Sequence, residues 1–480
     1  MKLKELFDKV PEGAGDVEVR GLTADSRKVV PGYVFAALEG VVTDGRKFVP
    51  QAVAQGAVAV LAASYDGEAG VPVITDAEPR LALARAAARL AGAQPETVIG
   101  VTGTNGKSST VDFLRQIWAG MGRKAASLGT LGAIGPDGVI DLRHTTPDPV
   151  AIHDTLATLA RSGVTHAAME ASSHGLVQFR LDAVRLKAAA FTNLTQDHLD
   201  YHPDMDAYRA AKMRLFTELL PEGAPAIINA DSPEAVRFEA GARSGGLDIV
   251  SIGWRGTDLK IRELMPRATG QRMFLTWRGE EFELDLPLIG EFQALNALCA
   301  AALALSLGDD LAGVARGLEA LQPVKGRLEF VGQTRDGAGV FVDYAHTPDG
   351  LDTLLRAARP HTAGRLILIF GCGGDRDRTK RPKMGEIAAR QADLVIVTDD
   401  NPRSEVPATV RAEVRAGCPG AREIGDRAEA IKTAIAELRR GDTLLIAGKG
   451  HETGQIIGDR VLPFSDQETA VAVLKEVANA

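Results

Sequence analysis

One short motif constrains this chain more than any other part of its sequence. The apolar residues 97–101 lead into the sequence GTNGKS at residues 103–108, and helix-forming residues follow. This order predicts a strand, a glycine-rich turn and the start of a helix. Backbone N–H groups in such a turn point at phosphates, and the helix N-terminus adds partial positive charge. We therefore expect a nucleoside triphosphate site, with Lys107 on the terminal phosphates and the Ser108 hydroxyl on Mg²⁺.

The spacing of the two glycines makes this loop unusual. A standard P-loop spaces its glycines as G-x-x-x-x-G-K, which would place the first glycine at position 101. Here Val101 occupies that position, and the first glycine is Gly103. The loop is therefore more compact than the loops of motor proteins and GTPases.

Length and composition set the class of protein. A chain of 480 residues is too long for one hydrophobic core, so we expect about three domains. The net charge of −8 argues against a nucleic-acid partner. The cysteines Cys299, Cys372 and Cys418 form no disulfide or zinc pattern, and no apolar run reaches transmembrane length. We expect a cytoplasmic monomer without membrane insertion.

The order of apolar and polar segments predicts three α/β domains. Strand-like segments alternate with alanine-rich helices over residues 1–92, where a glycine and a following proline indicate a linker. The P-loop strand opens a second domain, residues 93–323, with a largely parallel sheet and a hairpin near residues 272–286. The alternation restarts after Pro323, which gives a third domain at residues 324–480.

Three polar loops of the third domain predict one ligand site. Residues 371–376, 399–403 and 448–452 are rich in glycine and charge, and each follows an apolar strand-like run. Ligands of open α/β sheets bind at the carboxyl ends of strands, where such loops meet. The glycines of the first loop lack the G-x-G-x-x-G register, so a dinucleotide is not favoured.

Several isolated side chains allow more than one interpretation. Glu170 ends an apolar strand and suits Mg²⁺, although an ordinary strand-end acid has the same pattern. Lys212 lies in an amphipathic helix, for which the sequence alone predicts a solvent-facing charge. Residues 193–202 contain two histidines and two aspartates that resemble a metal cluster, but a solvated loop is the preferred interpretation. The histidines lack zinc-binding spacing, which disfavours a zinc enzyme.

Taken together, these motifs resemble the Mur ligase family over essentially the whole chain. Residues 25–27, 145–148 and 400–403 resemble the branch that adds the third residue of the peptidoglycan stem peptide. The family resemblance rests on residues 103–108, 170–175, 193–201, 208–212, 292–296, 326–327, 343–348 and 448–452.

The resemblance implies both a fold and a reaction. The implied fold is α/β, with a central P-loop parallel-sheet ATPase domain between an N-terminal UDP-binding domain and a C-terminal Rossmann-like domain. The implied reaction is ATP-dependent amide ligation through an acyl phosphate. Its partners would be UDP-N-acetylmuramoyl-L-alanyl-D-glutamate and meso-2,6-diaminopimelate, and its cofactors ATP and two Mg²⁺ ions.

The same resemblance assigns the catalytic and metal-binding residues. Lys107, Glu170, His198 and Lys212 would be catalytic, and Ser108, Glu170 and His198 would bind Mg²⁺. Lys212 matches a lysine that CO₂ converts to a carbamate, which adds a carboxylate for the metal and reverses the solvent-facing interpretation.

Nucleotide and substrate roles follow in the same way. The residues implied for the nucleotide are Gly103, Thr104, Asn105, Gly106, Lys107, Ser108, Ser109, Asn296, Arg327, Asp343 and His346. Those implied for the muramoyl dipeptide are Ser26, Thr145, Thr146, Ser172, Gln178 and Arg180. Those implied for diaminopimelate are Arg376, Asp400, Asn401, Pro402, Arg403, Gly448 and Glu452.

Other functions stay open at this point. A ligase for L-lysine or L-ornithine, a D-alanyl-D-alanine-adding ligase and a folylpolyglutamate ligase share much of this pattern, although residues 401–403 speak against them. A nucleotide-gated binding module without catalysis is a further alternative. The joint presence of Lys107, Glu170, His198 and Lys212 argues against it.

Overall fold

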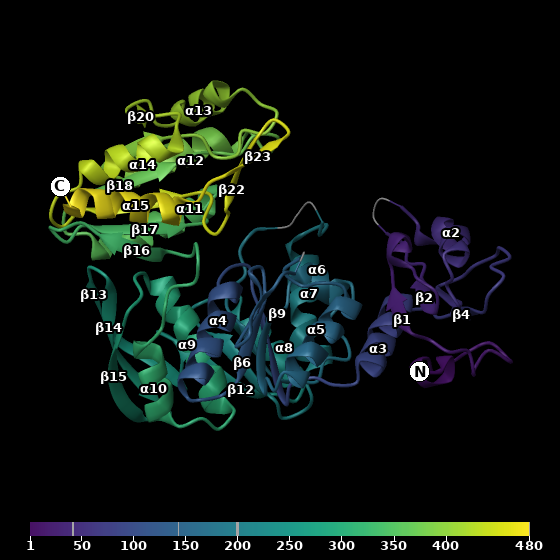
Figure 1. Ribbon diagram of the computed structural model, residues 1–480. Coiled ribbons are helices and arrows are strands. Elements are labelled where there is room, and N and C mark those ends of the chain that lie inside the picture. The colour runs from purple at the N-terminus through teal and green to yellow at the C-terminus, as the bar shows by residue number, and fades with distance from the viewer. Residues whose placement is uncertain (41–42, 143, 198–200, 480) are drawn as a thin grey trace. The chain divides into compact units, whose positions relative to one another are not determined.

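The computed structural model describes residues 1–40, 43–142, 144–197 and 201–479, and helices and strands alternate along them (Figure 1). The chain divides into two compact units. The first comprises residues 1–259 and 299–314, and the second comprises residues 260–298 and 315–480.

The N-terminal part of the first unit is a small parallel sheet with helices on both faces. Its strands lie in the order β1-β2-β3-β4. Side chains alternate along β2, so that Val34 and Ala36 pack with α1 and α3, and Phe35 packs with α2. The bounds are β1 Gly21–Thr23, β2 Tyr33–Ala36, β3 Ala59–Ala62, β4 Val73–Thr75, α1 Leu3–Leu6, α2 Val49–Ala54 and α3 Pro79–Ala91.

The larger part of the first unit carries the P-loop at the centre of its sheet. The strand order is β12-β11-β10-β5-β9-β6-β7-β8, parallel from β12 to β6 and antiparallel from β6 to β8. The strands are β5 Thr97–Thr102, β6 Ala125–Gly129, β7 Gly132–Gly135, β8 Gly138–Ile140, β9 His166–Glu170, β10 Leu186–Phe191, β11 Pro225–Asn229 and β12 Asp248–Gly253. The helices are α4 Lys107–Gly120, α5 Pro149–Arg161, α6 Ser173–Val177, α7 Met205–Arg214 and α8 Ala235–Ser244.

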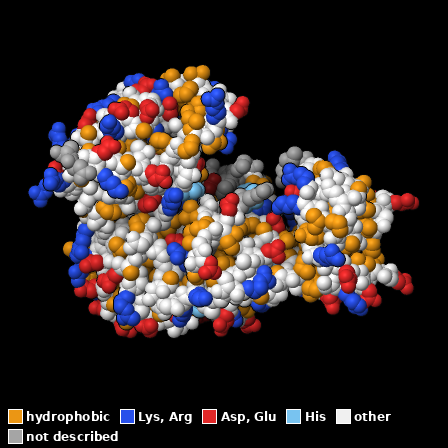
Figure 2. Space-filling model, viewed as in Figure 1, with side chains coloured by type: hydrophobic (Ala, Val, Ile, Leu, Met, Phe, Trp, Pro, Cys, Tyr) orange, Lys and Arg blue, Asp and Glu red, His pale blue; other side chains and the backbone are white. Residues whose placement is uncertain are grey.

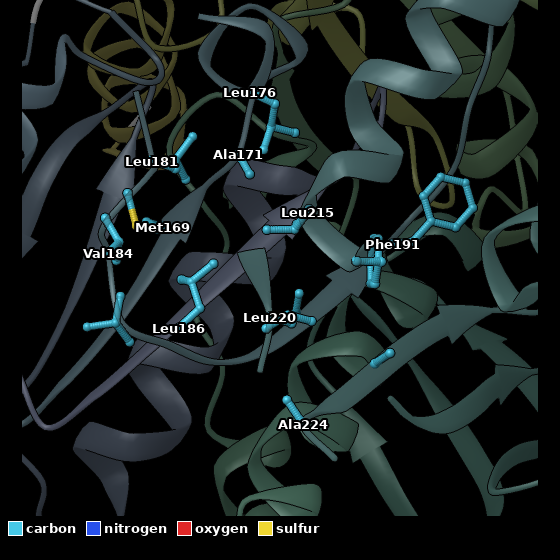
Figure 3. Close-up of a cluster of buried hydrophobic side chains, with 14 of the residues drawn as sticks. Met169, Ala171, Leu176, Leu181, Val184, Leu186, Phe191, Leu215, Leu220 and Ala224 are labelled. Carbon is cyan, nitrogen blue, oxygen red and sulfur yellow. The ribbon is translucent and has the colours of Figure 1, made fainter. Parts of the chain in front are cut away.

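A large cluster of buried apolar side chains fixes the helices to one face of this sheet (Figure 3). Met169 and Leu186 come from strands, and Leu215 comes from the segment after α7. Phe191 stacks on Phe238 of α8, with ring centroids 3.6 Å apart. Burying one such side chain stabilises the fold by roughly 1.5–3 kcal/mol, so the cluster holds the strand ends that carry the P-loop region.

The sheet of the second unit has helices on both faces. Its strands lie in the order β16-β17-β21-β18-β19-β20, and only β16 among them is antiparallel to its neighbour. Leu368 of β18 packs with α11, α12 and α13, whereas Ile367 and Ile369 pack with α14 and α15. The strands are β16 Glu329–Gln333, β17 Gly339–Asp343, β18 Leu366–Phe370, β19 Leu394–Val397, β20 Arg422–Glu423 and β21 Thr443–Ala447. The helices are α11 Pro348–Ala358, α12 Lys380–Gln391, α13 Pro407–Arg415, α14 Arg427–Ala436 and α15 Asp466–Asn479.

Two antiparallel hairpins and two further helices complete the structure. The expected hairpin near residues 272–286 is present as β14 (Gly270–Trp277) and β15 (Glu280–Leu286), preceded by β13 (Leu259–Arg267). A second hairpin, β22 (Gly454–Ile457) with β23 (Arg460–Pro463), follows β21. Helices α9 (Glu291–Ser306) and α10 (Leu311–Glu319) each include residues of both units.

Charged side chains of both signs are interspersed over the face shown in Figure 2. Among the residues that the structure describes, no helix combines the length and apolarity that crossing a bilayer requires.

Candidate active site

The P-loop packs tightly against the end of β10. Gly103 has a φ of +145°, and a Cβ at this position would overlap the Thr192 hydroxyl. Gly106, with a φ of +87°, precedes the first turn of α4. Both backbone conformations favour glycine, so the two glycines of the motif are required by the shape of the loop.

Residues after β10 hold this loop through its polar groups. The Thr192 hydroxyl donates to the Asn105 carbonyl at 2.6 Å, and the Asn105 N–H donates to the Asn193 side chain at 3.0 Å. The Thr195 N–H donates to the Thr104 hydroxyl at 3.0 Å. Residues 193–195 therefore support the P-loop. The sequence alone had favoured a solvated loop for this segment. Thr192 is a support of the P-loop that sequence reasoning missed.

Two lysines converge on the carbonyl of Gly103. Lys107 Nζ donates to the carbonyls of Gly103 and Thr104 at 3.0 and 2.8 Å. Lys212 Nζ donates to the Gly103 carbonyl at 2.7 Å, and its side chain is buried. Burial, with a contribution from Lys107, lowers the pKa of Lys212 well below its usual value. The solvent-facing interpretation of Lys212 is therefore wrong.

Glu170 lies beside the P-loop because β9 pairs with β5, with Glu170 opposite Val101. Its Oε1 accepts a hydrogen bond from the Ser108 hydroxyl at 2.8 Å and another from the Thr130 N–H at 2.9 Å. A carboxylate and a hydroxyl suit Mg²⁺, which commonly takes one or two carboxylates together with substrate phosphates.

The protein ligands available for a metal are few in the described part of the chain. Among those residues there is no group of three or more His, Cys, Asp or Glu side chains placed to hold a metal ion. The expected ligand His198 lies outside the described residues. Ser108 and Glu170 thus fit Mg²⁺ only as a partial ligand set that phosphate oxygens would complete.

The residues expected to hold the muramoyl dipeptide gather around the end of β9. The Thr146 hydroxyl donates to the Glu170 carbonyl at 2.8 Å and accepts from the Ser172 N–H at 3.1 Å. Arg180 donates to the Thr146 carbonyl at 2.6 Å and to Gln178 Oε1 at 2.7 Å. Burial lowers the pKa of Arg180. A half-buried guanidinium that contacts Thr146 can bind an anionic group of a substrate.

The two remaining residues of this set, Thr145 and Ser26, lie in different parts of the first unit. The Thr145 and Thr130 hydroxyls lie 3.0 Å apart, which places Thr145 near Glu170 through Thr130. Ser26 lies in the short helix Ser26–Lys28 of the N-terminal part, where its hydroxyl donates to Gln51 at 3.4 Å. The structure therefore joins Thr145 to the P-loop region and provides no contact that joins Ser26 to it within the described residues.

In the second unit, the residues expected to hold the nucleotide form one cluster. Asp343, at the end of β17, accepts the N–H groups of Leu328 and Ala345, each at 2.7 Å. The Arg327 guanidinium lies 4.8 Å from the ring centroid of Tyr344. Burial raises the pKa of Asp343.

Two residues extend this cluster. Asn296 donates to Gln293 Oε1 at 3.0 Å, and Gln293 in turn donates to the Arg327 carbonyl at 2.8 Å. His346 Nδ1 lies 2.9 Å from the Tyr344 carbonyl, and its side chain is exposed. An imidazole and two amides are groups that can hydrogen bond a nucleotide.

The three polar loops at the ends of β18, β19 and β21 meet, as the sequence predicts. Asn401 Nδ2 donates to Glu452 Oε2 at 2.8 Å. A Cβ at Gly448, which has a φ of +118°, would lie 2.6 Å from Asp400 Oδ2. The β22–β23 hairpin joins the same place, since Gln455 donates to the Asp400 carbonyl at 2.7 Å.

Lys449 is the residue of this site that sequence reasoning missed. Its side chain is fully buried, and Nζ donates to Asn401 Oδ1 at 3.0 Å and to Glu452 Oε2 at 3.1 Å. The contacts of Asn401 and Lys449 to Glu452 both use Oε2. The only signal in the sequence was its place between Gly448 and Glu452.

Arg403 and Arg376 have unequal environments. Arg403 is partly buried, and its Nη1 donates to the Gly374 carbonyl at 2.9 Å. Arg376 is exposed and donates to the carbonyl of its neighbour Asp375 at 3.0 Å. Pro402, between Asn401 and Arg403, is buried. Arg403 is therefore the better placed of the two cations to recognise a carboxylate.

Comparison with known proteins identifies the family of the chain. Residues 18–91 match the Mur ligase family catalytic domain, residues 101–304 the Mur ligase middle domain, and residues 326–450 the Mur ligase glutamate ligase domain. A relative from Agrobacterium fabrum is 52% identical over 473 residues, which cover 98% of this chain and 96% of the relative. The chain belongs to the Mur ligase family.

Two curated relatives of this Mur ligase share one name. The Agrobacterium fabrum protein and one from Mesorhizobium japonicum, 52% identical over 483 residues and covering all of both chains, are each a "UDP-N-acetylmuramoyl-L-alanyl-D-glutamate--2,6-diaminopimelate ligase". A solved structure of a ligase with that name matches with a TM-score of 0.76 and 32% identity, covering 99% of each chain.

A more distant structure shows the fold alone. A Thermotoga maritima MurF ligase in complex with ADP matches with a TM-score of 0.64 and 17% identity, covering 97% of this chain and 99% of that one. The predicted α/β fold of a three-domain Mur ligase is confirmed.

The shape of the P-loop leads to a first testable prediction for this Mur ligase. Gly103→Ala adds a methyl group where the Thr192 hydroxyl lies and imposes a φ that alanine avoids. We expect ATP affinity to fall by about 100-fold or more, because the loop must leave β10. Isothermal titration calorimetry measures this. In the control Gly120→Ala, the new methyl group meets open space at the end of α4, so ATP affinity is retained. Equal affinities for Gly103→Ala and wild type would contradict the assignment.

Proposed function

We propose that this Mur ligase joins meso-2,6-diaminopimelate to the D-glutamate γ-carboxylate of UDP-N-acetylmuramoyl-L-alanyl-D-glutamate, with conversion of ATP to ADP and phosphate. The observation that carries the proposal is the 52% identity, over nearly the whole chain, to relatives named for this reaction. The reaction belongs to peptidoglycan synthesis, and hence to cell-wall growth, cell shape and cell division. We place the protein in the cytoplasm, as a monomer.

The reaction has two steps, phosphoryl transfer and amide formation. The γ-carboxylate attacks the terminal phosphorus of ATP, an O–P bond forms, and ADP leaves. The diaminopimelate amine then adds to the acyl carbon, loses a proton, and phosphate leaves as the amide forms. Lys107, at the start of α4, neutralises charge on the phosphoryl oxygens, and the N–H groups of the P-loop orient them.

Two Mg²⁺ ions are the proposed metal cofactors. When bound beside the P-loop, they would neutralise the negative charge on the phosphoryl oxygens during transfer. Ser108 and Glu170 support one such site because their oxygens lie 2.8 Å apart beside the P-loop. His198 and a carbamate on Lys212 would supply the remaining protein ligands.

The surroundings of Lys212 support its conversion to a carbamate. Carbamate formation joins the amine nitrogen to the carbon of CO₂ and releases one proton, so it requires the neutral amine. The lowered pKa of Lys212 increases the fraction of neutral amine at physiological pH. The carbamate supplies an anion where Lys212 and Lys107 otherwise place two cations near one carbonyl.

Replacing Lys212 tests this role. Lys212→Ala removes a metal-holding anion, so we expect kcat to fall by about 100-fold or more while the protein remains folded. Added acetate or propionate should restore part of the rate by filling the vacated space with a carboxylate. Lys187→Ala, which removes an exposed lysine of β10, is the control and should keep wild-type kinetics. A fully active Lys212→Ala enzyme would refute the assignment.

Each domain has a proposed task. We assign the UDP-muramoyl moiety to residues 1–92 through Ser26, ATP to residues 93–323, and diaminopimelate to residues 324–480. Support for this division comes from the three family matches, at residues 18–91, 101–304 and 326–450, since each lies within one of the three proposed domains.

The third-domain loops suit the distal amino-acid group of diaminopimelate. That group carries a carboxylate and an ammonium. Arg403 can form two parallel hydrogen bonds to the carboxylate, and the carboxylates of Asp400 and Glu452 suit the ammonium. Lysine lacks the distal carboxylate and would leave the Arg403 guanidinium without an anion in a partly desolvated pocket.

Selectivity should therefore depend on Arg403. An unpaired buried charge costs about 2–5 kcal/mol, which corresponds to roughly 30- to 5,000-fold discrimination against lysine. Arg403→Ala should raise the KM for diaminopimelate strongly and shrink the gap to lysine in steady-state kinetics. Arg422→Ala, which removes an exposed arginine paired with Glu437, should change neither KM. If Arg403→Ala keeps the wild-type preference, another residue selects the amino acid.

An amino-acid screen for phosphate release tests the function as a whole. The purified chain receives ATP, Mg²⁺ and the UDP-muramoyl dipeptide, with one amino acid added to each reaction. We expect stoichiometric phosphate and amide product only with diaminopimelate present. Turnover with lysine or ornithine in its place would identify a different ligase of the same branch. Nucleotide binding without phosphate release under every condition would indicate a binding module.

A further inference from the structure

A buried guanidinium ties together two of the loops that form the amino-acid site. Arg381 belongs to α12, and its side chain is fully buried. Its Nη2 and Nη1 donate to the two carboxylate oxygens of Glu405, at 2.7 and 2.9 Å. Nη2 also donates to the Gly373 carbonyl at 3.1 Å. Arg381 therefore binds the loop before α12 and the loop after β19 at the same time.

Both contacts involve segments next to Arg403. Glu405 is two residues after Arg403 in the chain. Gly373 precedes Gly374, whose carbonyl accepts the hydrogen bond from Arg403 Nη1 at 2.9 Å. Arg381 thus fixes both the backbone that carries Arg403 and the surface on which the Arg403 guanidinium rests.

The backbone at this place requires such support. Arg403 and Asp375 have φ values of +51° and +53°, in the left-handed region that residues other than glycine seldom adopt. A conformation of this kind persists only where surrounding contacts determine it. The β22–β23 hairpin supplies one set of contacts, since the Arg403 N–H donates to the Ile456 carbonyl at 3.0 Å.

A second set of contacts runs through Asp375 and Glu405. Asp375 accepts the Ser404 hydroxyl at 2.6 Å and the Ser404 N–H at 3.1 Å. The Asp375 N–H donates to Glu405 Oε1 at 2.7 Å, the same oxygen that Arg381 Nη2 contacts. Arg381 thus holds the carboxylate on which the junction between the two loops depends.

The chemistry of Arg381 suits this task. Nη1 also donates to Glu413 of α13 at 2.7 Å, so two carboxylates balance its charge. A guanidinium donates in several fixed directions at once, whereas a lysine ammonium is a point charge on a flexible stem. Burial removes competition from water, so the geometry of the fork is kept.

We propose that Arg381 is a positioning residue for amino-acid selection, which holds Arg403 in the geometry that accepts a second carboxylate on the incoming amino acid. This inference rests on the proposed function, in which Arg403 binds the distal carboxylate of diaminopimelate. Arg381 itself acts through Glu405 and Gly373 and does not bind the substrate.

Steady-state kinetics of Arg381→Met in the full chain test the proposal. The KM for diaminopimelate should rise about 10- to 100-fold, because a guanidinium displaced by an ångström loses its alignment. The KM values for ATP and the UDP-muramoyl dipeptide should stay at wild-type values, and kcat should change much less than the KM for diaminopimelate. A merely structural role would instead reduce the active fraction and lower kcat with every KM unchanged, which would overturn the proposal.

Arg365→Met is the matched control. Arg365 donates to Asp442 Oδ2 from Nε and Nη2, at 3.1 and 2.6 Å, at the opposite ends of the strands that carry the site loops. Its loss removes a similar guanidinium–carboxylate pair of the same domain. We expect a lower melting temperature with no change in any KM. A rise in the KM for diaminopimelate equal to that of Arg381→Met would overturn the proposal, because loss of any such ion pair in this domain would then have the same effect.

A double-variant cycle separates this inference from the proposed function. If Arg381 acts through Arg403, then Arg381→Met adds little to the KM for diaminopimelate once Arg403→Ala is present. An equal additional rise would overturn the inference and leave the role of Arg403 intact. An unchanged preference in Arg403→Ala alone would instead remove the proposed role of Arg403, and the inference with it. Should Arg381→Met not fold, Glu405→Gln, which keeps the shape of the side chain, replaces it with the same expected outcomes.

Discussion

The close approach of Gly103 to the end of β10 is the constraint on which the P-loop region of the first unit depends. No side chain fits between this residue and Thr192, so the loop backbone itself meets the strand end. The Gly103 carbonyl then lies where both Lys107 and Lys212 reach it. With its position fixed by packing, the loop can present N–H groups to phosphates without reorganisation when the nucleotide binds.

Parallel strand pairing brings the remaining groups to the same edge in both units. In the first unit, β5 lies between β9 and β10, so Glu170 and Thr192 flank the P-loop. In the second unit, β21 lies between β17 and β18, so the loop that starts at Gly448 lies beside Asp343. Each unit therefore brings its candidate site residues together at the carboxyl ends of adjacent strands, with the proposed phosphate-binding groups in the first and the proposed amino-acid-binding groups in the second.

The sequence predicted the parts of this arrangement that a local pattern determines. Long apolar runs ending in glycine or acid predicted β5, β9 and β18 and the loops after them. The β7–β8 and β22–β23 hairpins were missed because their strands are short and lack a buried run. Lys212 and Lys449 could not be placed from pattern alone. The sequence does not distinguish a buried lysine from an exposed one, because its partners come together only in the tertiary fold. The domain boundaries and the binding roles of the site residues stay predictions.

The buried cations of the two units differ in the groups that accept their hydrogen bonds. Arg381 and Lys449 each donate to carboxylates, so their charges are balanced and their geometry is fixed. Lys212 donates to a neutral carbonyl instead, and burial lowers its pKa. The effect of burial on Lys212 outweighs the opposing effect of the Asp197 charge, and loss of the proton reduces the cost of burying the ammonium. The paired cations therefore suit the holding of loops in place, whereas the environment of Lys212 favours the neutral amine that the proposed carbamate requires.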